Sequence, residues 1–110
     1  MVHKLLKLYT SLYKDIQKFP KLDKFSLGLK IENLTLEIIE NILLARTKLS
    51  ASQILVLNKA DVQLKLLGFF WRIAFETKTI EQKKYIGIQE KILEIGKILG
   101  GWLKKAKERV

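Results

Sequence analysis

The residues that could do chemistry in this chain are few, and they limit the reactions open to it. The sequence has no cysteine and a single histidine, His3. A thiol nucleophile, a disulfide framework and a cysteine-based zinc site are therefore excluded. The di-metal carboxylate sites of helical bundles need Glu-x-x-His pairs on facing helices, and the sequence contains no such pair. We therefore expect no catalytic residue, no metal site, no cofactor and no enzymatic activity.

One acidic residue stands out because of its position. Asp61 falls on or next to the apolar stripe of a predicted helix, and a buried carboxylate needs a partner. We interpret Asp61 as half of an ion pair with a basic residue of a neighbouring helix, such as Arg46 or Arg72. A catalytic acid is the alternative, but no nearby residue would complete such a site.

Lysine is the dominant charged group. The 110 residues contain 21 Lys and Arg against 11 Asp and Glu, a formal charge of +10. Residues 1–30 and residues 83–110 each carry +5, whereas residues 31–82 are balanced. Such a surface either keeps a protein in solution or binds a polyanion. Because lysines outnumber arginines 18 to 3, contacts with phosphates would be point-charge contacts that ignore base sequence.

A membrane surface is an alternative partner for the same charge pattern. The apolar faces, however, are those expected of a helical bundle. The longest apolar stretch of the third predicted helix, Leu66–Trp71, is far shorter than the roughly 18 residues that a membrane span needs. The first residues lack the apolar core and the cleavage site of a secretion signal. We expect a soluble cytoplasmic protein that does not bind membranes.

Apolar residues recur every three to four positions in four segments, which predicts four helices. Pro20 ends the first, and the second runs from about residue 24 to residue 48. Short connections make consecutive helices antiparallel. The sequence therefore predicts a single all-α domain over residues 1–110, an antiparallel up-down four-helix bundle.

Two capping boxes predict where the third and fourth helices begin. Ser50 and Gln53 have the spacing in which a hydroxyl and an amide side chain satisfy the free N–H groups of a helix start. Thr79 and Gln82 repeat that spacing. The third helix should therefore begin at about Ser50 and the fourth at about Thr79.

Glycines in the predicted helices need an explanation, because each costs about 1 kcal/mol relative to alanine. The glycines concerned are Gly28, Gly96, Gly100 and Gly101. We interpret them as places where another backbone, or the bulky Trp71 or Trp102, comes close.

The third predicted helix is apolar on nearly every side between Leu66 and Phe75, and only Gly68 and Arg72 interrupt the run. A helix that is apolar all round must be covered all round, but three neighbours in one bundle leave its outer face open. An exposed aromatic patch on a small protein usually marks an interface. We therefore predict self-association through four residues of this helix: Leu66, Phe69, Phe70 and Ile73.

Three segments together resemble a known family. They are Phe19-Pro20-Lys21, then Phe25-Ser26-Leu27-Gly28 leading to Ile31-Glu32-Asn33, and last Glu94-Ile95-Gly96-Lys97-Ile98-Leu99-Gly100-Gly101-Trp102. Over nearly the whole chain the sequence is similar, in order and spacing, to the accessory variability determinant (Avd) proteins of diversity-generating retroelements. That family belongs with the four-helix-bundle proteins encoded in intervening sequences of bacterial 23S rRNA genes. The last segment is the most specific.

The resemblance implies four antiparallel helices assembled as a barrel-like homopentamer without enzymatic activity. It implies two partners, the reverse transcriptase of the retroelement and nucleic acid bound with little sequence preference, namely template RNA and possibly DNA. The complex supports error-prone, adenine-directed cDNA synthesis from a template-repeat RNA, which diversifies a variable-repeat gene. A basic run on the third helix is also implied. Lys65 and Arg72 fit that run, and Gly68 between them departs from it.

We predict that the third helix and the C-terminal basic cluster contact phosphates. The residues are Lys65, Arg72, Lys97, Lys104, Lys105, Lys107 and Arg109. Two other functions stay open at this point: a homologue encoded in an rRNA insertion, with the same fold and an unknown role, and a purely protein-binding module. The flanking genes distinguish the first from a retroelement protein, and retention of random RNA at low salt tests the second.

Overall fold

The computed structural model describes residues 1–110, which are helical apart from short connections. The helices are α1 (Val2–Gln17), α2 (Lys21–Asp23), the π-helical turn η1 (Lys24–Gly28), α3 (Leu29–Ala45), α4 (Ser50–Glu76) and α5 (Gln82–Glu108). No strand is present. The predicted second helix is thus α2, η1 and α3 in continuous succession, and the prediction of an all-α chain is confirmed.

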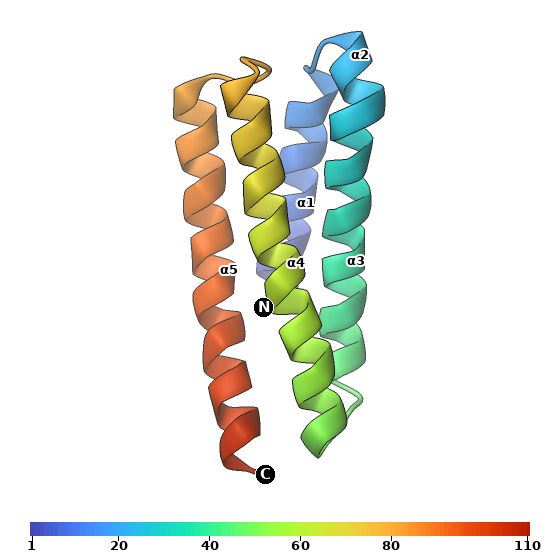
Figure 1. The fold of residues 1–110 in the computed structure, drawn as a ribbon, viewed down its shortest axis with the longest axis vertical. Coiled ribbons are helices and arrows are strands. Elements are labelled where there is room, and N and C mark those ends of the chain that lie inside the picture. Colours follow the sequence, from blue (N-terminus) through green and yellow to red (C-terminus); the bar gives the residue numbers. More distant parts are fainter.

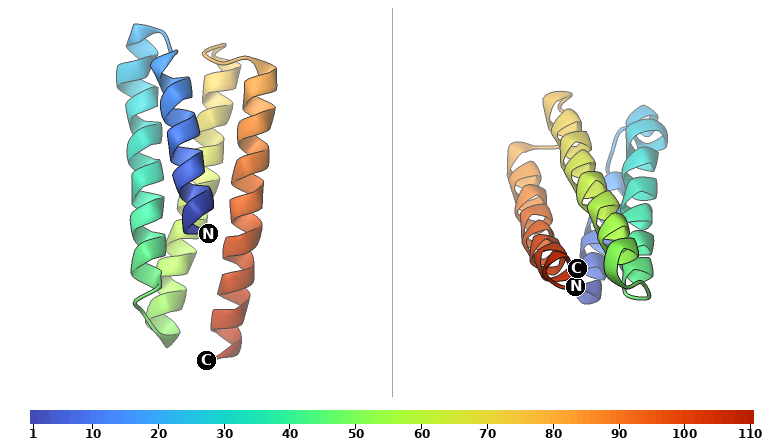
Figure 2. Two further views of the ribbon diagram at one scale, coloured as in Figure 1. Left: turned by 180° about the vertical axis from the view of Figure 1, so that it is seen from behind. Right: turned by 60° about the horizontal axis from the view of Figure 1, so that its bottom comes forward.

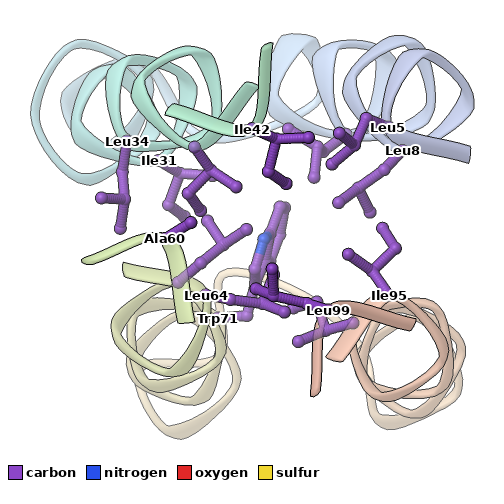
Figure 3. Packing of buried hydrophobic residues seen from close by; sticks show 14 of the residues in the cluster. Leu5, Leu8, Ile31, Leu34, Ile42, Ala60, Leu64, Trp71, Ile95 and Leu99 are labelled. Carbon is purple, nitrogen blue, oxygen red and sulfur yellow. The ribbon is translucent and has the colours of Figure 1, made fainter. Parts of the chain in front are cut away.

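The four long helices run antiparallel to their neighbours along a body of 47 × 22 × 21 Å (Figure 1). Seen along the bundle, α1 lies between α3 and α5, and α4 closes the ring between α3 and α5 (Figure 3). The helix α1 starts part of the way along the bundle, so α5 extends past it at the end where the chain terminates (Figure 2). This is the predicted up-down arrangement.

The core consists of one apolar stripe from each long helix. Side chains such as Leu5, Ile42, Leu64 and Leu99 point toward a shared centre from α1, α3, α4 and α5 (Figure 3). Trp71 is fully buried among them, and the ring of Phe19 meets it edge-on, with 5.8 Å between centroids. Burial of these side chains supplies most of the driving force that holds the helices together.

Pro20 separates α1 from α2, as the sequence predicts, and the following π-helical turn places Gly28 against α1. A Cβ on Gly28 would lie 2.8 Å from Cγ2 of buried Ile16 and 3.3 Å from the carbonyl oxygen of Asp23. Gly28 is therefore closely packed, as predicted, but its closest neighbour is the Ile16 side chain and not the backbone of another helix, Trp71 or Trp102.

The same interpretation is wrong for the two glycines near the end of α5. A Cβ on Gly100 or on Gly101 would meet no atom within 4 Å. At Gly96 it would make only an ordinary contact, 3.6 Å from Cδ2 of Leu64. Packing inside this chain gives no reason for glycine at positions 100 and 101.

Both predicted capping boxes are wrong, although the helix starts they marked are nearly right. No side chain caps α4 or α5. Ser50 has a left-handed φ of 53°, and the tight turn before α4 directs the Gln53 amide to the carbonyl oxygen of Ala45, 3.0 Å away, at the end of α3. The Thr79 hydroxyl lies 2.9 Å from the Thr77 hydroxyl within the turn before α5. The chain reversals use these side chains to close the turns.

Two glycine-to-alanine exchanges should therefore change stability in opposite directions. Gly100→Ala adds helix propensity in open space and should raise the free energy of unfolding by up to about 1 kcal/mol. Gly28→Ala forces Ile16 or the backbone near Asp23 to move and should lower it by about 1–3 kcal/mol. Urea denaturation measures both, and a Gly28→Ala protein as stable as the wild type would contradict the close packing of η1 on α1.

Candidate nucleic-acid interface

Two of the predicted phosphate contacts face each other across the surface between α4 and α5. Lys65 on α4 and Lys97 on α5 line a shallow pocket of about 270 Å³. Its apolar floor includes Leu64 and Ile92, and Gly96 leaves room because it has no side chain. Arg72 lies two turns beyond Lys65 along the same edge of α4. The structure therefore brings Lys65 and Lys97 together, with Arg72 further along.

Both predicted phosphate contacts of α4, Lys65 and Arg72, are paired with acids of their own helix. Lys65 Nζ lies 3.1 Å from Asp61 Oδ2, and Arg72 Nε lies 3.4 Å from Glu76 Oε1. Exposed pairs four residues apart are worth only about 0.3–0.5 kcal/mol, so a phosphate can compete for them. Each acid still offsets the charge of its partner, which makes the α4 residues the weaker part of the predicted site.

The ion pair predicted for Asp61 exists, but the predicted partners are wrong. Asp61 pairs with Lys65, one turn away on α4, and not with Arg46 or Arg72. The side chain of Asp61 is 27% exposed, so it lies at the edge of the core and not within it. At that position the basic side chain within reach is that of Lys65, one turn along the same helix.

The C-terminal basic residues occupy a different place. Lys104, Lys105, Lys107 and Arg109 are exposed at the end of α5, and none of them forms an ion pair. This end of α5 extends beyond the start of α1 (Figure 2). Cations at a helix C-terminus also interact favourably with the helix dipole. The cluster is therefore an accessible, uncompensated positive surface.

The helix order brings most of the excess charge to one side of the bundle. Residues 1–20 carry four lysines against one acid, and residues 83–110 carry eight basic residues against three acids, so α1 and α5 with their flanks hold +8 of the formal +10. The two helices are neighbours (Figures 2 and 3). The predicted contacts included no residue of α1. The +5 of residues 1–30 was the signal that could have pointed to that helix.

The predicted association surface lies on the outer side of α4. Phe69 is 60% and Leu66 42% exposed, whereas Phe70 and Ile73 are half-buried. Two further exposed residues, Leu55 and Val62, extend this side of the helix. Because Leu55, Val62 and Phe69 are seven residues apart, they form a stripe with the spacing of a coiled-coil seam.

A second exposed apolar stripe with the same spacing runs along α3. It comprises Leu29, Leu36 and Leu43, and none of these three belongs to the core. The helices α3 and α4 therefore present two apolar stripes, whereas α5 exposes Ile86 and Leu93, also seven residues apart, together with its lysines.

No helix is both long enough and apolar enough to cross a membrane. Groups of three or more His, Cys, Asp or Glu side chains suited to holding a metal ion do not occur in the chain.

No curated protein matches the sequence. The family model described as bAvd-like matches residues 1–106. The match covers α1 to α4 and nearly all of α5, and it confirms the resemblance to Avd proteins. The chain belongs to the bAvd-like family.

Proposed function

We propose that this protein is a non-enzymatic accessory protein of a diversity-generating retroelement. It binds the reverse transcriptase together with template RNA, and possibly the DNA copy, and supports mutagenic reverse transcription in the cytoplasm. Membership of the bAvd-like family supports this class of function, since Avd-type proteins are accessory and non-catalytic. The observation that carries the proposal is the segregation of charge: α1 and α5 hold nearly all the excess lysine on one side of the bundle.

The basic surface of α1 and α5 is suited to a polyanion because few acidic side chains of the chain neutralise its lysines. Repulsion among charges of one sign destabilises a compact protein unless a ligand of opposite charge binds there. A nucleic acid is such a ligand, because its phosphates release condensed counterions when lysines bind them. With 18 lysines and 3 arginines the surface holds the backbone and does not read bases. That property fits a protein that must accept any template sequence.

We further propose that the protein works as a homo-oligomer, a pentamer by family resemblance. A ring of identical chains uses two different surfaces of each protomer. The α3 and α4 stripes supply two such surfaces of equal spacing. Glu37 and Glu40 lie on the exposed side of α3, whereas Lys59, which forms no ion pair, lies beside the α4 stripe, so these charges are complementary. Association through this side keeps the lysines of α1 and α5 apart.

The function as a whole is tested with the polymerase. A reverse transcriptase encoded beside this gene should co-elute with the protein, and the pair should copy template-repeat RNA into adenine-mutagenised cDNA that the polymerase alone does not make. Gel filtration and sequencing of the cDNA are the measurements. Flanking genes without a reverse transcriptase or paired repeats would overturn the proposal and favour the rRNA-insertion homologue.

Removing the C-terminal cluster should weaken RNA binding without changing sequence preference. The variant Lys104→Gln/Lys105→Gln/Lys107→Gln/Arg109→Gln should lose affinity evenly across random RNAs. The slope of log K against log salt should shrink by about three, because each phosphate contact to a single strand contributes about 0.7. Filter binding from 50 to 300 mM salt measures it. Lys65→Gln/Arg72→Gln is the comparison and should have a smaller effect per residue, since Asp61 and Glu76 already offset those charges.

Polar residues on the outer side of α4 should dissociate the oligomer. Leu66→Gln/Phe69→Gln changes two exposed side chains and leaves the core intact, so the folded protein should sediment as a 12.8 kDa monomer while the wild type sediments as an oligomer. Leu6→Gln/Leu93→Gln alters equally exposed leucines on α1 and α5 and should stay oligomeric. A wild-type monomer at micromolar concentration would contradict the proposed assembly.

A further inference from the structure

The surface along which α1 and α5 meet is hollowed by a row of three pockets. These shallow pockets, of about 340, 350 and 230 Å³, follow one another along these helices. The first and second share Asp15 and Lys84, and the second and third share Lys91. We call this surface the seam groove. Six lysines line it: Lys4, Lys7, Lys18, Lys83, Lys84 and Lys91.

Only part of this charge is neutralised within the chain. Three acids line the groove, and two of them form ion pairs across it. Lys84 Nζ lies 2.8 Å from Asp15 Oδ1, and Lys4 is hydrogen-bonded to Glu94. That hydrogen bond and the charge of Lys4 hold the pKa of the Glu94 carboxyl below its usual range. The third acid, Glu81, forms no ion pair.

Four of the six lysines are free of carboxylates. Lys7, Lys18 and Lys83 form no ion pair, and Lys91 donates a hydrogen bond to the Ser11 hydroxyl, at 3.0 Å, and to no acid. With six lysines against three acids the groove carries a net charge of +3. The groove therefore contains more lysines than its ion pairs within the chain neutralise.

A glycine keeps the middle of the groove open. Gly87 lines the central pocket within α5, and a Cβ there would meet no atom within 4 Å. Glycine in a helix interior is conformationally costly, and no packing inside this chain requires it. A longer side chain at this position would stand in the groove. Gly87 therefore leaves the central pocket unobstructed, which is an observation independent of the charges.

We propose that the seam groove holds the phosphate backbone of a single nucleic-acid strand. The inference rests on the proposed function and adds a binding surface, formed by α1 and the first half of α5, to the residues predicted from the sequence. From Glu81 to Ile95 the groove follows α5 for about 21 Å. A stacked strand places about six phosphates over that length.

The chemistry of the groove favours nucleic acid over an acidic protein. Its apolar side chains, such as Leu8, Ile88 and Ile95, are buried beneath the lysines and belong to the core. Of the large apolar side chains that line the groove only Ile80 is not fully buried, so the groove offers little to the aromatic and aliphatic anchors that dominate protein interfaces. Neighbouring helix axes lie about 10 Å apart, so the groove between them admits one strand and not a duplex.

A pair of charge-matched variants tests the location. Lys7→Gln/Lys18→Gln/Lys83→Gln removes three unpaired lysines from the groove. Lys21→Gln/Lys30→Gln/Lys48→Gln removes three exposed, unpaired lysines from α2, α3 and the turn after α3, and it changes the net charge equally. The groove variant should bind a random single-stranded RNA at least about tenfold more weakly at 0.1 M salt, with the salt slope reduced by about two. The control variant should reduce the slope by less than a third of the reduction expected for the groove variant.

A second pair tests the groove without altering charge. Gly87→Gln places a side chain in the central pocket and should lower RNA affinity several-fold. Gly87→Ala changes helix propensity in the same direction without reaching across the groove and should bind as the wild type does. Circular dichroism verifies that both are folded. Equal affinity of Gly87→Gln and Gly87→Ala for RNA would contradict the placement of the strand across the central pocket.

The outcomes separate the two proposals. If the wild type retains no RNA at low salt, both the proposed function and the seam groove are wrong. If it binds RNA but both triple variants lose affinity equally, the groove alone is wrong. Polyglutamate of matched charge serves as competitor: weak competition supports a nucleic-acid strand, and competition equal to that of unlabelled RNA would replace the strand with an acidic protein segment.

Discussion

Mutual repulsion between unmatched lysines is the constraint around which this structure is organised. Four apolar stripes bring the helices together, and the up-down order makes the first and last helices neighbours. The two most basic segments of the chain therefore share one side of the bundle. Only two ion pairs cross between them, Lys84 with Asp15 and Lys4 with Glu94. The charge on this side is therefore largely uncompensated within the fold, and the proposed function rests on it.

The side of the bundle formed by α3 and α4 has a low net charge and exposes apolar residues. Residues 21–82 carry nine basic residues against seven acids and expose apolar residues at heptad spacing on α3 and α4. Two surfaces of low net charge can approach each other without the repulsion that two lysine faces would meet. The proposed assembly through α3 and α4 and the proposed binding through α1 and α5 use different sides of each protomer. The same arrangement of charge therefore makes the two proposals compatible in a protein of +10.

The spacing of residues along the sequence was sufficient to predict the local features of the fold, namely the helices and the break between the first two. The apolar period gave four helices, Pro20 gave the first break, and the family resemblance gave the class. The wrong predictions concern which distant groups meet. Asp61 lies at a helix edge and pairs with Lys65, and Gln53 closes the end of α3 in place of capping α4. The seam groove was missed for the same reason, because only the order of helices around the bundle brings Lys7 near Lys91.

The groove also changes how the basic residues of α4 should be regarded. Lys65 and Arg72 are already paired with acids one turn away, and Gly68 interrupts the run that the family resemblance implies. Four of the six groove lysines form no ion pair, so the proposed phosphate strand reaches them without displacing an acid and relieves existing repulsion. A ligand that binds the folded state alone stabilises it. In the proposed complex that stabilisation includes relief of the repulsion among the groove lysines, so nucleic-acid binding and folding depend on the same side chains.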